Sequence, residues 1–159
     1  MGELRAGFLF KDGFLFFGKT YVYNSMSETP IQKQIRSVEE FHDAFGIPNQ
    51  YSPVADITAD GALLRYELIR EENEEYLEAC KEGNLVEIAD ALGDQLYILC
   101  GTILKHGLQH VIEDVFDEIH RSNMSKLGED GKPIYREDGK VLKGPNYFKP
   151  DIRKILDGQ

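Results

Sequence analysis

Acidic residues recur at helical spacing in two neighbouring segments, a pattern that can hold a divalent cation. With 100° of rotation per residue, one face of residues 60–82 carries Leu64, Leu68, Glu75 and Ala79, and Glu71 and Glu72 border it. In residues 84–106, a sector of roughly 60° carries Glu87, Asp90, Asp94 and Gly101. Carboxylate oxygens are the ligands that Mg²⁺ prefers.

The second acidic stripe lies in residues 84–106, which we predict to form a central helix. Its far side is a leucine stripe, and its second half is apolar nearly all round, so we expect the acids to face another helix rather than water. Buried unpaired carboxylates cost several kcal/mol each, and the few basic residues nearby lie mostly on other faces. A bound cation would offset that cost. The alternative is a solvated acidic face, which fits Glu74, Glu78 and Glu82.

Four helices are expected from apolar periodicity and from capping residues, over residues 31–45, 60–82, 84–106 and about 109–124. Asp60 is the expected N-cap of the second helix, Gly83 its stop, and Asn84 the cap of the third. We divide the chain into an N-terminal extension (1–25), a helical domain (26–127) and an extended, turn-rich C-terminal arm (128–159). Residues 1–25 read either as a hairpin around Asp12-Gly13 or as a non-native stretch upstream of a start at Met26.

Composition excludes several classes of function. The chain of 159 residues carries a formal net charge of −10, which disfavours a nucleic-acid footprint. It has no apolar run of membrane-spanning length and no continuous apolar signal-peptide centre, so we expect no membrane partner. The two cysteines, Cys80 and Cys100, predict no disulfide framework and are expected in the core. These features favour a cytoplasmic protein.

The acidic segments resemble a known family at this point. Arg70-Glu71-Glu72-Asn-Glu-Glu75, followed by Glu87-Ile-Ala-Asp90-Ala-Leu-Gly-Asp94, is similar to the paired motif of the all-α nucleoside triphosphate pyrophosphatases. These are the MazG-like proteins, the dimeric dUTPases and the phosphoribosyl-ATP pyrophosphohydrolases. The similarity spans about residues 31–127. The segment His120-Arg-Ser-Asn-Met-Ser-Lys126 also resembles the closing helix of the phosphoribosyl-ATP pyrophosphohydrolase-like branch.

One position departs from the family pattern. The second half of the motif is Glu-x-x-Asp, and alignment through Asp94 places Ala91 at the glutamate. Alignment one turn earlier fits Glu87 and Asp90 literally. We favour Asp94 with Asp90 and keep Glu87 as the substitute ligand.

The resemblance implies a fold, a cofactor and a reaction. The fold would be an all-α bundle completed by dimerisation, as a homodimer or a tetramer. One or more Mg²⁺ ions, with Mn²⁺ as an alternative, would be held by Glu72, Glu75, Asp90 and Asp94. Glu71 would activate the water that attacks the α-phosphorus and releases pyrophosphate. The alternative for Glu71 is a surface acid paired with a basic neighbour.

Cationic and polar residues further along the chain are candidates for contacts with the nucleotide. They are Arg121, Asn123 and Lys126 at the end of the fourth helix, and Lys143 and Tyr147 in the arm. Ordinary charge at a helix C-terminus is an equal interpretation of the first group. Two rival functions stay open, a phosphoribosyl-ATP pyrophosphohydrolase and a non-enzymatic acidic helical interaction module. The sequence does not identify the base, so non-canonical nucleotides and dUTP are both candidate substrates.

Overall fold

A computed structural model describes residues 29–158, and these form five helices. The helices are α1 (Pro30–Ala44), α2 (Ala59–Glu82), α3 (Leu85–Lys105), α4 (Ile112–Met124) and α5 (Ile152–Asp157). Within residues 29–158, extended pairing is confined to one antiparallel bridge between Tyr135 and Val141 in the arm. The all-α prediction is confirmed, whereas the proposed N-terminal hairpin lies outside the described residues.

Side chains and glycines set the ends of the helices largely as predicted. Gly83 ends α2 in the left-handed conformation with φ of 67°, and Asn84 accepts hydrogen bonds from Val86 N and Glu87 N to cap α3. The predicted cap of α2 was wrong: its N-cap is Thr58, whose Oγ1 accepts from Gly61 N at 3.1 Å. The helix therefore begins one residue before Asp60, which sits in its first turn.

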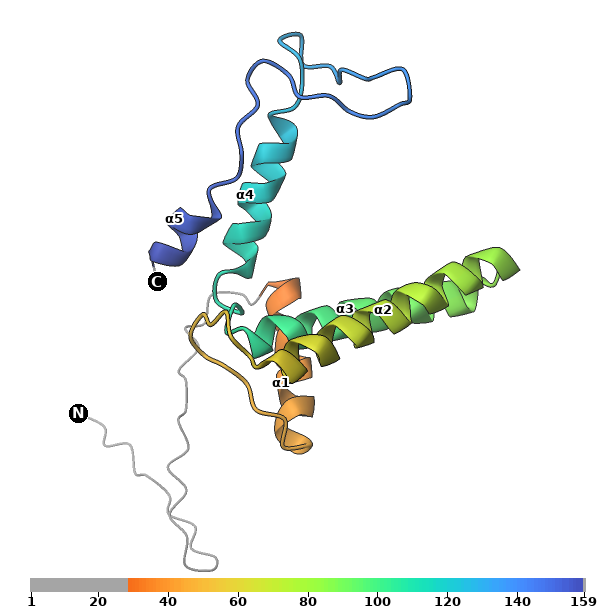
Figure 1. The fold of residues 1–159 in the computed structure, drawn as a ribbon, viewed down its shortest axis with the longest axis vertical. Helices are drawn as coiled ribbons and strands as arrows, with labels where there is room; N and C mark the ends of the chain where they lie inside the picture. The colour runs from red at the N-terminus through yellow and green to blue at the C-terminus, as the bar shows by residue number, and fades with distance from the viewer. Residues whose placement is uncertain (1–28, 159) are drawn as a thin grey trace, which may run out of the picture.

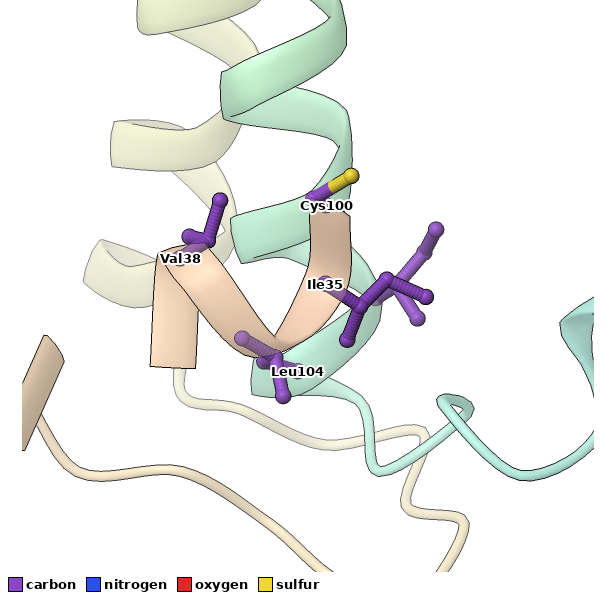
Figure 2. Packing of buried hydrophobic residues seen from close by; sticks show 5 residues of the cluster. Ile35, Val38, Cys100 and Leu104 are labelled. Atoms are coloured by element: carbon purple, nitrogen blue, oxygen red, sulfur yellow. The ribbon is translucent and has the colours of Figure 1, made fainter. Parts of the chain in front are cut away.

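The core lies where α1 crosses the C-terminal end of α3. Figure 2 shows Ile35 and Val38 of α1 packed against Cys100 and Leu104 of α3, and all four are buried. Cys100 therefore occupies the core as predicted. Cys80 does not, because it sits near the far end of the α2–α3 pair, where α1 does not reach, and it is exposed.

The helices are arranged in two groups that diverge from a common centre. In Figure 1, α2 and α3 run side by side as a long antiparallel pair, while α4 leads away from them with α5 beside it. Helix α5 was missed in the sequence, which predicted an extended arm there. Asp151 is its N-cap, since its Oδ1 accepts from Lys154 N at 3.2 Å, and Asp151 N also donates to Oε1 of Glu118 on α4 at 2.8 Å. No helix in the described part of the chain is long and apolar enough to span a membrane.

Candidate active site

The seam between α2 and α3 contains a carboxylate with no partner. Glu72 faces α3, its Oε2 atom has no contact with solvent, and no hydrogen-bond donor reaches that atom. Burial raises the pKa of Glu72 above its ordinary value, and the charges of Asp94, Glu75, Glu71 and Asp90 raise it further, in that order. An orphaned carboxylate oxygen surrounded by four acids is a costly arrangement that calls for a positive ligand.

Glu72 and four other acids lie along one side of the helix pair, which we call the acidic flank: Glu71, Glu72, Glu75, Asp90 and Asp94. The expectation that the acidic stripe is buried against another helix was wrong, since all of these except Glu72 are exposed in the single chain. The exposed acids lie beside the contact between α2 and α3 and not within it. Glu87 lies one turn nearer the α2–α3 loop and is not among the four carboxylates that act most on Glu72.

The acidic flank offers carboxylate oxygens, the ligands that a hard divalent cation prefers, although its carboxylates do not lie close together. Among residues 29–158, no three His, Cys, Asp or Glu side chains stand close enough to form a closed metal site. Mg²⁺ does not require one, because it keeps several waters and is usually bound by one or two carboxylates together with substrate phosphates. The donor set and the orphaned Oε2 of Glu72 therefore fit Mg²⁺.

A solvated acidic face also exists, on the side of α2 where the sequence suggested it. Glu74 pairs with Arg70 at 2.6 Å and Glu78 with Lys81 at 2.9 Å, with all four side chains well exposed. Arg70 also pairs with Glu67 at 2.6 Å. The cations of α2 thus neutralise its outer acids and leave the acidic flank uncompensated.

A cavity of 650 Å³ opens at the other end of the same side of the helix pair. Its walls come from α1, α2, α3 and the α1–α2 loop, and they include Phe41, Leu64, Leu68 and Tyr97. Leu68 precedes Glu71 and Glu72 by one helical turn, and Tyr97 follows Asp94 by one turn, so the cavity adjoins the acidic flank. A volume of this size is typical of small-ligand sites.

The sequence interpretation missed the charged residues of this cavity. Arg65, Lys105 and His42 all line it, and the sequence analysis singled out none of them. His42 is buried, and its Nδ1 lies 2.5 Å from Oδ1 of Asn49. One signal was available in the sequence: Arg65 lies seven residues, two helical turns, before Glu72 and therefore shares its face.

The predicted nucleotide contacts of α4 and the arm are not brought to the acids within one chain. Arg121 pairs with Glu118 at 2.5 Å and lies over the ring of Phe148, while Lys126 donates to Oδ1 of Asn123. In the arm, Nζ of Lys143 lies 4.3 Å from the ring centre of Tyr147. Since α4 leads away from α2 and α3 in Figure 1, these residues lie apart from the acidic flank of their own chain.

The match to a family model, and not the helix pair alone, identifies the class of this chain, the all-α nucleoside triphosphate pyrophosphohydrolases. The model of the family "Phosphoribosyl-ATP pyrophosphohydrolase" matches residues 38–123, more than half of the chain, and the chain belongs to this family. The match includes α2, α3 and nearly all of α4.

Two individual proteins are also similar to the chain. An uncharacterized protein of Acanthamoeba polyphaga mimivirus is 30% identical over 128 residues, which cover 77% of this chain and 47% of that protein. The chain thus spans about half the length of this relative. The crystal structure of a "putative NTP pyrophosphohydrolase" from Exiguobacterium sp. 255-15 covers 84% of this chain and 100% of its own, with 24% identity and a TM-score of 0.43.

Proposed function

We propose that this protein is a Mg²⁺-dependent nucleoside triphosphate pyrophosphohydrolase, converting an NTP or dNTP and water to the monophosphate and pyrophosphate. The observation that carries the proposal is the orphaned Oε2 of Glu72, buried among the other acids of the flank. On a purely structural face, Glu72 would be exposed or paired, as the outer acids of α2 are. A metal site instead keeps carboxylates close and unpaired until the cation arrives.

The cavity and the acidic flank together suit the two ends of a nucleotide. Gly101, which lines the cavity, lies seven residues after Asp94, a distance of about 10 Å along α3. A triphosphate placed at the acids would therefore direct its sugar and base toward the cavity. The apolar and aromatic walls formed by Leu68, Phe41 and Tyr97 are suited to the faces of a base.

In the proposed mechanism, Glu72, Glu75, Asp90 and Asp94 would hold Mg²⁺, with Glu87 as the alternative ligand. When bound, the ion supplies positive charge against the triphosphate oxygens. Glu71 is exposed beside this set and accepts a proton from the attacking water. The water oxygen forms a bond to the α-phosphorus, the bond from that phosphorus to the bridging oxygen breaks, and pyrophosphate leaves.

The proposal predicts Mg²⁺-dependent release of pyrophosphate from at least one nucleoside triphosphate. Purified protein would be tested against canonical, deoxy and modified triphosphates, in Mg²⁺ and in EDTA, with Mn²⁺ as a third condition. Ligand linkage also predicts that Mg²⁺ at 100 times its Kd stabilises the fold by about 2.7 kcal/mol. A chain that hydrolyses none of these substrates and shows no Mg²⁺-linked change in thermal midpoint would instead be an interaction module.

Phosphoribosyl-ATP is the second candidate substrate, favoured by the family model that matches the chain. Its hydrolysis would use the same acids and differ only in what occupies the cavity. Including it in the substrate panel separates this candidate from the removal of non-canonical nucleotides or dUTP.

A second copy of the chain is the proposed partner, because the side of the helix pair opposite the acidic flank is apolar and uncovered. We call this side the leucine flank: Leu85, Leu92, Leu96 and Leu99 of α3, with Ile69 of α2. These side chains are 76%, 49%, 38%, 48% and 38% exposed. A shallow groove runs along it between Ile69 and Leu96. A two-fold axis through this flank would bury leucine against leucine, as isologous dimers do.

The dimer proposal predicts a particle of twice 18.1 kDa in analytical ultracentrifugation. Leu96→Glu would place a charge in the centre of the interface and yield monomers with a lower thermal midpoint. Val86→Glu is the matched control, since Val86 is 74% exposed on α3 but lies about 100° from the leucine sector. An unmodified chain that stays monomeric at micromolar concentration would contradict the proposal.

A further inference from the structure

Arg65 is a cation held in place by neutral acceptors. Its Nε donates to Oγ1 of Thr102 at 2.9 Å, and its Nη2 donates to the carbonyl oxygen of Ile98 at 2.5 Å. Both acceptors belong to α3, so the guanidinium bridges the two long helices. Among residues 29–158, no carboxylate forms an ion pair with it. Burial lowers the pKa of Arg65, yet a guanidinium stays protonated in proteins.

The free donors of Arg65 belong to a side chain that lines the cavity. Nη1 has no acceptor among the described residues, although a guanidinium carries five N–H donors and its two bonds to α3 use only two. The cavity's only carboxylate in the described chain, Asp56, accepts from Thr58 N, and its lysine, Lys105, donates to the Pro48 carbonyl. Asp56 therefore forms no ion pair with Arg65, and Lys105, itself a cation, offers it no acceptor.

Gly101 makes room for this arrangement. A Cβ atom at that position would lie 3.0 Å from Nη2 of Arg65 and 3.2 Å from Nε2 of His42. The absence of a side chain on α3 therefore lets the guanidinium and the imidazole meet at the cavity wall. A cation placed there without a counter-charge is stable only while its remaining donors meet water or a ligand.

We propose that Arg65 recognises the base of the nucleotide by donating hydrogen bonds to an acceptor edge, so that the site prefers bases with a carbonyl oxygen at purine C6 or pyrimidine C4 (keto bases) to bases with an amino group there. This inference rests on the proposed hydrolysis of nucleoside triphosphates, with the phosphates at the acidic flank and the base in the cavity. It names guanine, uracil and thymine as preferred bases and disfavours adenine and cytosine.

The selectivity follows from the fixed polarity of the guanidinium, which can only donate. Guanine offers O6 and N7 as adjacent acceptors, and uracil and thymine offer O4. Adenine and cytosine present an amino group at the matching position, which would oppose donor to donor and leave both unsatisfied. Sites built for one pattern of hydrogen bonding reject the other strongly, because buried polar groups are then left unpaired.

The test compares kcat/KM for dGTP, dUTP and dTTP with kcat/KM for dATP and dCTP. The unmodified chain is expected to favour the keto group by about 10-fold or more, the scale of one hydrogen bond from a charged donor. Arg65→Leu should reduce that ratio toward 1 by slowing the keto substrates alone. Arg70→Leu is the matched control, an exposed arginine five residues along the same helix, and should leave the ratio unchanged.

Two further measurements separate this inference from the proposed function and from misfolding. Thr102→Val removes the acceptor of Arg65 Nε without removing the guanidinium, and should lower the keto preference by a smaller factor. Calorimetric binding of dGMP and dAMP in EDTA tests recognition without hydrolysis. If no triphosphate is hydrolysed but dGMP binds more tightly through Arg65, only the proposed function fails. Equal hydrolysis or binding of keto and amino bases overturns the role of Arg65. A keto preference that survives Arg65→Leu in a folded variant overturns it as well.

Discussion

Glu72→Gln is expected to abolish pyrophosphate release while making the metal-free protein more stable. Loss of a ligand that supports several kcal/mol of charge stabilisation in the transition state corresponds to a fall of about 10³-fold in kcat. In the absence of metal, the same change removes a charge that is surrounded by Asp94, Glu75, Glu71 and Asp90. Function and stability therefore oppose each other at this position, as they commonly do at active sites.

The stability gain would be measured as the thermal midpoint in EDTA across a range of pH. An unsatisfied buried polar group costs about 1–3 kcal/mol, and the lower end applies because the rest of the Glu72 side chain reaches solvent. For a domain of this size, about 1 kcal/mol raises the midpoint by about 2–4 °C. Since the pKa of Glu72 is raised in the folded state, the folded chain holds the extra proton, and its stability falls as pH rises through that window. The variant's advantage should therefore grow with pH.

Glu78→Gln is the control for Glu72→Gln, because Glu78 lies on the solvated face of the same helix and pairs with Lys81. It should retain full activity and shift the midpoint little, since exposed ion pairs contribute about 0–1 kcal/mol. A Glu72→Gln protein with wild-type activity would remove Glu72 from the ligand set. One that melts lower than the unmodified chain in EDTA would show that Glu72 has a stabilising partner.

Asp94→Asn is expected to cost far more activity than Glu87→Gln. Asp94 is the carboxylate that acts most strongly on Glu72 across the seam, whereas Glu87 is not among the four strongest. We expect a fall of about 10²–10³-fold in kcat for Asp94→Asn, on the same scale as other lost electrostatic contacts in active sites. Glu87→Gln should stay within a few-fold of the unmodified chain, and Asp90→Asn should resemble Asp94→Asn.

The Mg²⁺ concentration that gives half-maximal activity distinguishes the two possible ligand pairs. It should rise strongly in Asp94→Asn and in Asp90→Asn, because each removes an oxygen ligand, and stay unchanged in Glu87→Gln. The reverse order would establish Glu87 with Asp90 as the pair, in agreement with the literal spacing of the motif. Circular dichroism of each variant controls for loss of helix, since all three positions are exposed and tolerate an isosteric amide.

The helices were predictable because their determinants are local. Apolar periodicity and the capping side chains act within one or two turns, so α1, α2 and α3 begin and end within a residue or so of the predicted bounds. The failures lie at α5 and at the start of α2. Helix α5 forms where Glu118 accepts from Asp151 N, a contact between residues 33 positions apart. Thr58 caps α2 from a loop backbone with φ of 68°, which no spacing rule anticipates.

The acids of the candidate site were also found from spacing, but their environment was not. Helical rotation places Glu72 and Asp94 on faces that meet, and the structure brings them into electrostatic contact. The sequence analysis predicted that the whole acidic stripe of residues 84–106 faces another helix. Residue spacing does not show how far the contact between α2 and α3 extends around each helix. Arg65 was overlooked for the same reason, since only the approach of α2 to α3 gives this arginine its acceptors at Thr102 and Ile98.

The sequence alone determined the helical class, the bounds of the long helices and the presence of acids on two neighbouring helices, because periodicity and capping are properties of short segments. Only the tertiary structure decided that Glu72 alone among those acids enters the seam, that a cavity adjoins them, and that Arg65 and His42 meet at Gly101. The physical reason is that burial and the pairing of charges depend on how helices pack, which is set by contacts between residues far apart along the chain.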